Sequence, residues 1–255
     1  MSKPIALINQ PCGLGDILFT LKIGRVLSEN YRVIWPIHSS YRSIKEKVSA
    51  GSIEFYTTDE DFPEKEQFRI LSSQHINDCT SFTNGYLYCP ITRSTYSKAA
   101  QKIAGYERAN MFGKYAMCDV DPSNWMDSFS FVRDYQKESE LYSFLKIDEP
   151  YHLVNSRFGT PPEWEVNLHK TIPTREGLGR IDIKIYDQYD VFDWLGVLEK
   201  ASQIDTVATS LPFLFENLNL NCVPTIHSRN KNSNEAEENF TLMKEIYKKD
   251  YKYEA

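Results

Sequence analysis

The stretch 4–30 constrains the fold more than any other, because it reads as a strand, a glycine turn and a helix. Residues 4–8 form a short apolar run that two polar residues and a proline close, which predicts a strand. Gly13 and Gly15 then allow a tight turn that residues with a Cβ resist. From Ile17 onward the apolar residues follow helical spacing. The turn therefore opens a helix and directs bare N–H groups at whatever lies above it.

Asp16 lies in the first turn of this predicted helix. A carboxylate at that place is stabilised by the helix dipole, so Asp16 is either an ordinary helix-start residue or a functional group facing the turn. Gly13, Leu14 and Gly15 form the turn itself. His38 follows the next predicted strand, 32–37, and either lines the same site or is a solvated loop histidine.

The glycine pattern excludes two common nucleotide-binding motifs. A dinucleotide fingerprint needs a third glycine where Leu18 stands, and an acidic residue after the second strand, where the chain reads Pro-Ile-His. A Walker loop needs Gly-Lys-Ser/Thr, which does not follow the turn. A nicotinamide enzyme is therefore not indicated.

Predicted strands and helices alternate along the whole chain, which favours an α/β architecture with mainly parallel sheets. The predicted strands are 4–8, 32–37, 53–57, 68–71, 86–91, 151–155, 181–186, 205–209 and 222–226, and long loops are predicted at 59–67 and 161–180.

The charged, proline-bearing link at 148–150 is the best domain boundary. It predicts an N-terminal α/β domain over 1–148 and a C-terminal α/β domain over 149–232. The last stretch, 233–255, contains a predicted helix that could return to the first domain.

A first candidate phosphate site follows the predicted strand 151–155. Ser156 and Arg157 come directly after it, at the carboxyl edge where open α/β sheets bind ligands. Arg157 can form paired hydrogen bonds to a pyrophosphate, and Ser156 can donate its hydroxyl. The alternative is that Arg157 pairs with one of the many surface carboxylates.

A second candidate phosphate site follows the predicted strand 205–209. Thr209, Ser210 and Leu211 begin a helix whose bare N–H groups and two hydroxyls favour an anion. The alternative is an ordinary helix start with Ser210 as its N-cap. Tyr186 and Asp187 end the neighbouring predicted strand, and from topology alone we expect them near a nucleobase.

Composition limits the partners. A net charge of −6 argues against a nucleic-acid surface, and no apolar run is long enough to span a membrane. The five cysteines lack a Cys-x-x-Cys pair, which is typical of reduced thiols in a cytoplasmic protein. The five histidines lack metal-ligand spacing, so no metal site is predicted.

The sequence Gly13-Leu14-Gly15-Asp16-Ile17-Leu18 resembles the N-terminal loop of the heptosyltransferase-like glycosyltransferases, which read Gly-x-Gly-Asp-hydrophobic-hydrophobic. The resemblance implies the GT-B fold, in which two Rossmann-like domains face each other across a cleft. It also implies that Asp16 is the general base.

A second stretch, 203–218, resembles the family's donor-domain segment, in which a helix start meets the phosphates of the nucleotide sugar. Ala208-Thr209-Ser210-Leu211-Pro212-Phe213 lacks the acid, the glycine and the histidine of the family's Asp-Ser/Thr-Gly-x-x-His pattern.

The expected function is metal-independent transfer of a sugar from a nucleotide sugar to the hydroxyl of a glycan or other acceptor, as in glycan biosynthesis. The nucleotide sugar is a co-substrate, and no cofactor is expected. Two alternatives stay open: a non-catalytic nucleotide- or anion-binding protein of the same fold, and a metal-dependent phosphohydrolase. The sequence does not indicate an oligomeric state.

Overall fold

The computed structural model describes residues 3–83, 85–148, 150–160, 163–184 and 186–255. The predicted boundary residue Glu149, the first residues of the predicted loop 161–180 and Ile185 of the predicted strand 181–186 lie outside these ranges. The chain divides into two compact units, Met1–Ser130 and Phe131–Ala255. The division therefore precedes the predicted boundary, and the helical segment before 148 belongs to the second unit.

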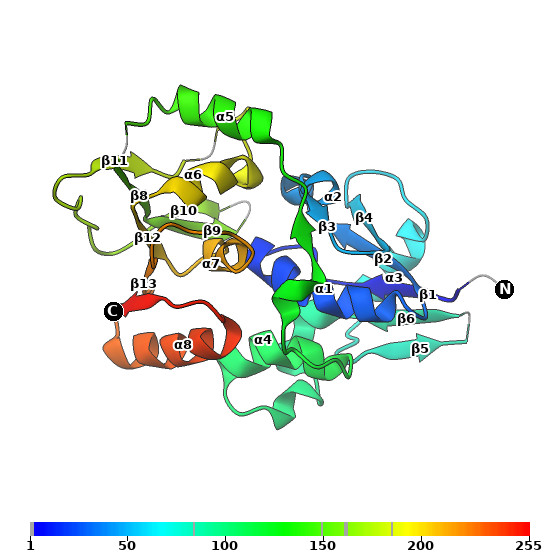
Figure 1. Ribbon diagram of the computed structural model, residues 1–255. Coiled ribbons are helices and arrows are strands. Elements are labelled where there is room, and N and C mark those ends of the chain that lie inside the picture. Colours follow the sequence, from blue (N-terminus) through cyan, green and yellow to red (C-terminus); the bar gives the residue numbers. More distant parts are fainter. Residues whose placement is uncertain (1–2, 84, 149, 161–162, 185) are drawn as a thin grey trace. The chain divides into compact units, whose positions relative to one another are not determined.

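The first unit is an α/β fold with a mainly parallel sheet in the strand order β4-β2-β1-β6-β5 (Figure 1). β1 pairs in parallel with both β2 and β6, and β5 closes the edge antiparallel to β6. With 3₁₀ helices labelled η, its elements are β1 (Ile5–Ile8), α1 (Leu14–Leu27), β2 (Arg32–Ile37), η1 (Ser39–Tyr41), α2 (Ile44–Lys47), β3 (Val48–Ser49), β4 (Ile53–Thr57), α3 (Lys65–Ser73), β5 (Thr80–Phe82), β6 (Tyr86–Cys89), η2 (Ile91–Tyr96), η3 (Ala100–Lys102), α4 (Tyr106–Met117) and η4 (Trp125–Ser128).

The order of these strands creates a switch point between β1 and β6. From β1 the chain adds β2 and β4 on one side, then returns to place β6 on the other. The connections that follow β1 and β6 therefore run in opposite directions along the sheet. Open α/β sheets bind ligands at the carboxyl ends of such a strand pair. The glycine turn follows β1 directly, so it lies at this place.

Close packing holds α1 against the sheet and against α4. A Cβ on Gly24 would lie 2.6 Å from Ile53 Cδ1, so the helix approaches the sheet where it has no side chain. On α1, the Phe19 ring meets Tyr115 of α4 and Trp125 of η4 edge to face, with centroids 5.0 and 5.4 Å away. Such aromatic pairs stabilise beyond their buried area, and they fix which residues of α4 lie beside the start of α1.

The strand predicted at 68–71 is wrong, because these residues belong to helix α3. Phe68 and Leu71 lie three residues apart, which places both on one helix face. Leu71 is buried, while Glu66 and Arg69 form an ion pair on the exposed side. A run this short cannot distinguish a strand from a helix by period. The loop predicted at 59–67 likewise ends where α3 begins.

The second unit contains a parallel sheet in the order β11-β8-β12-β13-β14. Its elements are α5 (Tyr135–Phe144), β8 (Tyr151–Asn155), β9 (Arg157–Thr160), β10 (Glu163–Asn167), β11 (Gly179–Asp182), η5 (Val191–Trp194), α6 (Leu195–Lys200), β12 (Gln203–Val207), α7 (Leu211–Phe215), β13 (Thr225–His227), α8 (Ser233–Ile246) and β14 (Lys252–Glu254), and β7 (Ser130–Phe131) lies at the junction of the units. Here the switch point lies between β8 and β12. The predicted α/β class with mainly parallel sheets is confirmed.

The loops predicted after β8 are wrong in part. Arg157 lies on strand β9, which pairs antiparallel with β10, and β10 falls inside the predicted loop 161–180. The hairpin forms because Phe158 packs on a buried cluster that includes Val154 of β8 and Val207 of β12. The predicted C-terminal helix is α8, and its return to the first domain stays a prediction.

A buried charged cluster crosses the second sheet. The Asp205 carboxylate on β12 lies 2.7 Å from His152 Nε2 on β8 and 2.8 Å from His227 Nε2 on β13. Gln203 donates to it at 3.0 Å, and Arg175 Nη2 lies 3.2 Å away. Burial alone would raise the pKa of Asp205, but these hydrogen bonds and the Arg175 charge hold it well below its usual range.

Each helix within the described ranges is too short or too polar to cross a membrane.

Asp205→Asn should lower the free energy of unfolding by about 3 kcal/mol, because it leaves buried partners without their charge. Asp182→Asn, which breaks a half-exposed pair with Arg180, is the matched control and should cost at most about 1 kcal/mol. Urea denaturation measures both.

Asp205→Asn should also change how the free energy of unfolding depends on pH in the acid range. A depressed carboxyl pKa contributes stability above the unfolded value, about 3.9, and this contribution is lost as pH falls toward the folded value. Wild type should therefore lose stability more steeply than Asp205→Asn between about pH 5 and pH 2. Parallel pH profiles would contradict the role given to Asp205.

Candidate active site

The glycine turn at the end of β1 is held by the end of β2. Gly13 is the N-cap of α1 and has a φ of +82°, a conformation that side chains resist. Its N–H donates to the Tyr41 hydroxyl at 3.2 Å, and the Pro11 carbonyl accepts from His38 N at 2.8 Å. Burial raises the pKa of Tyr41, so this hydroxyl stays neutral at physiological pH. The turn is a fixed feature of the first unit.

Asp16 forms an ion pair with a buried lysine. Its Oδ1 lies 3.1 Å from Lys114 Nζ on α4, and the Lys114 side chain is only 2% exposed, against 32% for Asp16. The ammonium also donates to Gln10 Oε1 at 2.6 Å. Gln10 is fixed in turn, since its carbonyl accepts from the Trp35 indole and its amide donates to the Cys12 carbonyl. The positive charge thus lies behind the carboxylate, inside the protein.

This arrangement leaves one carboxylate oxygen near the turn. A Cβ added to Gly13 would lie 2.5 Å from Asp16 Oδ2, so the glycine makes room for that oxygen. A buried ammonium needs partners, and here they are Asp16 and Gln10. The pairing orients the carboxylate while a third of it stays open to solvent. A fixed, accessible carboxylate can accept a proton from a bound hydroxyl.

The other predicted residues of this site have distinct places. Leu14 and Gly15 are buried in the first turn of α1. His38 is the N-cap of η1, where its Nδ1 accepts from Ser40 N at 3.3 Å. Its ring packs edge-on against Tyr41, which binds the glycine turn. The structure therefore brings Gly13, Asp16 and the His38 backbone into one contiguous arrangement.

In the second unit, Asn155 connects the two strand ends at the switch point. Its Nδ2 donates to Thr206 Oγ1 at 3.1 Å and to Thr209 Oγ1 at 3.4 Å. Asn155 ends β8, and Thr209 follows β12. The predicted phosphate residues after both strands therefore share one carboxyl edge.

The predicted cap of α7 is wrong. Ser210 makes no side-chain cap hydrogen bond, and Thr209 Oγ1 instead accepts from Leu211 N at 3.3 Å. Ser210 has a helical backbone conformation, which turns its hydroxyl away from the capping position. The helix has only five residues, so its dipole adds little to anion binding.

The remaining donor candidates lie on other elements. The Ser156 carbonyl accepts from Leu168 N at 2.7 Å, and Arg157 pairs in register with Asn167 across the hairpin. Tyr186 stacks on Trp194 at a 13° interplanar angle, and Asp187 is exposed. A nucleobase role for Tyr186 and Asp187 stays a prediction.

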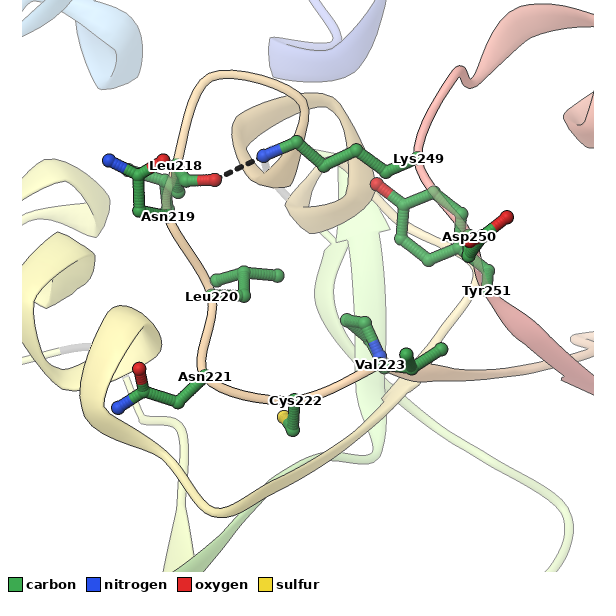
Figure 2. A pocket seen from close by; sticks show the side chains of 10 residues that line it. Leu218, Asn219, Leu220, Asn221, Cys222, Val223, Lys249, Asp250 and Tyr251 are labelled. Carbon is green, nitrogen blue, oxygen red and sulfur yellow. Dashed lines mark hydrogen bonds between the residues drawn. The ribbon is translucent and has the colours of Figure 1, made fainter.

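A pocket of about 380 Å³ lies elsewhere in the second unit (Figure 2). Lys249 reaches across it and donates to the Leu218 carbonyl, and Tyr251 donates to Glu216. The pocket is lined by the segments that lead into β13 and β14, so it lies at the amino edge of the sheet. Ligands of open parallel sheets bind at the opposite edge, and we do not assign the donor to this pocket.

Sequence reasoning missed Lys114 and Asn155. Gln10 and Lys114 are 104 positions apart, and only the packing of α4 on α1 brings them together. The available signal was a lysine between Gly113 and Tyr115, in a helical stretch that faces the core. Asn155 is a buried polar residue at the carboxyl end of a wholly buried strand, the edge at which open α/β sheets bind ligands.

No protein-family model matches the chain, and no curated protein matches it. Solved structures do match it, and the three described here are glycosyltransferases. The iron-containing dodecameric glycosyltransferase TibC from enterotoxigenic Escherichia coli has 12% identity and a TM-score of 0.48, and the match covers 89% of this chain and 58% of that one.

Two further structures are similar. The family 9 glycosyl transferase of Veillonella parvula has 9% identity and a TM-score of 0.48, with 91% of this chain and 83% of that one covered. The Escherichia coli heptosyltransferase WaaC has 12% identity and a TM-score of 0.37, with 88% of each chain covered. The chain spans less than two thirds of the length of TibC.

Gly13→Ala should displace the Asp16 carboxylate as well as strain the turn. Gly105→Ala is the matched control, because Gly105 is also a helix N-cap with φ +82°, but a Cβ there has nothing within 4 Å. Both variants should lose about 1–3 kcal/mol of stability from backbone strain, and Gly13→Ala should lose more. Chemical denaturation measures the difference, and equal losses would contradict the contact with Asp16.

Proposed function

We propose that this protein is a glycosyltransferase that moves a sugar from a nucleotide sugar to an acceptor hydroxyl. The observation that carries the proposal is the Asp16 carboxylate, which is oriented by buried Lys114 and partly open at the switch point of a parallel sheet. Ligands bind at such switch points. The Gly-Leu-Gly-Asp turn that presents Asp16 also resembles the heptosyltransferase-like loop.

Asp16 is the general base of this proposal. A sugar acceptor attacks through a hydroxyl that must lose its proton as the new bond forms, and a positioned carboxylate accepts that proton. Lys114 acts through Asp16, since its ammonium is buried and contacts Asp16 and Gln10. It holds the carboxylate in place, and its charge compensates the negative charge of the base.

The donor belongs, in this proposal, to the carboxyl edge of the second unit. Ser156, Arg157, Thr209 and Ser210 lie on or after the strands that flank its switch point. The departing diphosphate gains charge in the transition state, and fixed hydroxyls, N–H groups and a guanidinium can stabilise that charge without a metal. Asn155 connects the two strand ends that carry these groups.

The proposal requires both carboxyl edges to meet in one cleft, which is the GT-B arrangement expected from the sequence. Each unit supplies one half of the reaction, the acceptor base from the first and the diphosphate site from the second. A cytoplasmic location, where nucleotide sugars are made and consumed, remains part of this prediction.

One nucleoside diphosphate or its sugar should stabilise the protein without added magnesium. At a hundredfold excess over the dissociation constant, a ligand adds about 2.7 kcal/mol, which should raise the melting temperature by roughly 5–10 °C. A thermal-shift series with ADP, GDP, UDP, CMP and their sugars measures this. ADP-heptose belongs in the series because TibC has been solved with an ADP-heptose.

Arg157→Ala should remove that shift, whereas Arg69→Ala should keep it, because Arg69 pairs with Glu66 on the surface of the first unit. A series with no shift would overturn the donor assignment.

Asp16→Asn should keep the nucleotide-induced shift and lose turnover. Without the base, release of nucleoside diphosphate from the sugar nucleotide should fall by about 10²- to 10⁴-fold. Asp127→Asn is the control, because its exposed carboxylate lies in the same unit and takes no part in the proposal. Binding with turnover that is indifferent to Asp16→Asn would instead indicate a non-catalytic binding protein.

The phosphohydrolase alternative predicts turnover that a chelator abolishes. Magnesium prefers oxygen ligands. Within the described ranges, the side chains that converge as potential metal ligands are cysteines and not carboxylates. This donor set does not favour a magnesium-dependent hydrolase.

A further inference from the structure

Three cysteines of the first unit converge although they are far apart in sequence. The Sγ atoms of Cys79, Cys89 and Cys118 all lie within 4.8 Å of one another. Cys79 Sγ and Cys118 Sγ are 3.4 Å apart. Cys89 is fully buried, and the other two are half-buried. The proposed transfer reaction uses none of them.

Each cysteine is fixed by the backbone around it. Cys89 ends β6, and its carbonyl accepts from Asn9 N at 2.9 Å. Cys79 comes directly before β5, across the hairpin from Cys89, since Thr80 pairs with Tyr88. The neighbouring Asp78 carboxylate accepts from the Ser97 hydroxyl and from two backbone N–H groups, which anchors this strand start.

Cys118 is the C-cap of α4. The next residue, Asp119, has a φ of +52°, and Val120 N donates to the Tyr115 carbonyl at 3.1 Å. This is the Schellman ending of a helix, which sets the chain direction after the last turn. The carboxyl end of a helix also favours a positive charge, because its last carbonyls are unpaired within the helix. The third thiol therefore lies where a cation is favoured.

We propose that Cys79, Cys89 and Cys118 form a binding site for a thiophilic divalent metal ion of the zinc class. Thiolate sulfur is the ligand that zinc takes in structural sites, with Zn–S distances near 2.3 Å. Those distances place the sulfurs of a tetrahedral site about 3.8 Å apart, a few tenths of an ångström beyond the 3.4 Å between Cys79 and Cys118. Side-chain movements of up to about an ångström would bring the three sulfurs to tetrahedral spacing, since all of them already lie within 4.8 Å of one another.

A disulfide fits the geometry less well. It needs an S–S distance of about 2.05 Å, so Cys79 and Cys118 would have to approach by more than an ångström from 3.4 Å. It would also leave Cys89 buried beside it without a role. The described residues supply three thiol ligands, and solvent would take the fourth position, because the neighbouring Asp78 carboxylate already accepts hydrogen bonds from Ser97 and two backbone N–H groups.

The metal would clamp the elements that position Asp16. Cys118 lies one helical turn beyond Lys114 on α4, and Cys89 binds the backbone of Asn9, which leads into the glycine turn. The site joins the β5–β6 hairpin to the end of α4. Its role is structural, and its metal binding can be measured without any assay of sugar transfer.

Titration of the reduced protein with Co²⁺ tests the proposal. Wild type should bind one ion per chain and show the intense charge-transfer absorption of thiolate ligands. Cys79→Ser should weaken binding by more than the roughly 10- to 100-fold that loss of a ligand's supporting partner costs. Cys12→Ser is the control, since Cys12 is also half-buried in the first unit but lies outside the cluster, and it should bind as wild type does.

Elemental analysis of protein purified without chelator should find about one zinc per chain, and thiol titration should find three cysteines protected until chelator is added. If Cys79→Ser does not fold, Cys118→Ser takes its place. Absence of the charge-transfer band, equal binding by the Cys79→Ser and Cys12→Ser variants, or a mass that shows the loss of two hydrogens to a disulfide would overturn the proposal.

Discussion

The ion pair between Asp16 and buried Lys114 is the interaction on which the candidate site depends. An ammonium that is 2% exposed is costly to bury unless its partners are fixed. Gln10 and Asp16 satisfy it, and both lie at the start of the same loop and helix. A movement of this loop would leave the buried Lys114 ammonium without its partners. The loop is therefore held in one conformation.

The packing of α1 against α4 holds the two residues of this ion pair together. Phe19 packs on Tyr115, and the Tyr115 hydroxyl donates to the Phe19 carbonyl, so α1 and α4 are joined at two levels. Lys114 directly precedes Tyr115 on α4. The packing of Tyr115 on Phe19 therefore places the Lys114 ammonium beside Asp16. At the far end of α4, Cys118 meets the hairpin cysteines. One helix thus connects the carboxylate, its counter-charge and the thiol cluster.

Both sheets present their candidate groups at a switch point. The sequence predicts the parallel sheets and the strand ends at which these groups lie. Alternating apolar runs and helices predict parallel sheets, and short polar loops after strands predict where ligands bind. β2, β4 and β8 match their predicted bounds. Asp16, Ser156 and Thr209 were predicted in this way because each follows a strand or its turn, and their roles stay predictions.

The residues that could not be predicted from the sequence are those whose partners are brought near only by the folded structure. Lys114, Asn155 and the three cysteines act through partners that are distant along the chain, and spacing rules for motifs do not cover them. Arg157 was placed in a loop because its polar surroundings do not reveal the pairing of β9 with β10, in which Phe158 packs on the core. Ser210 has the residue type of a cap, but the hydroxyl of Thr209 accepts the hydrogen bond from Leu211 N. In both cases the contacts in the folded chain, and not the local residue preference, determine the structure.

The most direct test of this account is a double-mutant cycle on Asp16 and Lys114, read as release of nucleoside diphosphate from the sugar nucleotide that stabilises the protein. Lys114→Met alone should slow release at least tenfold while nucleotide binding is kept, because the carboxylate loses its orientation. In the Asp16→Asn background the same change should have almost no further effect, since Lys114 acts only through Asp16. If the two effects multiply instead, Lys114 does not position the base, and the account of the site is wrong.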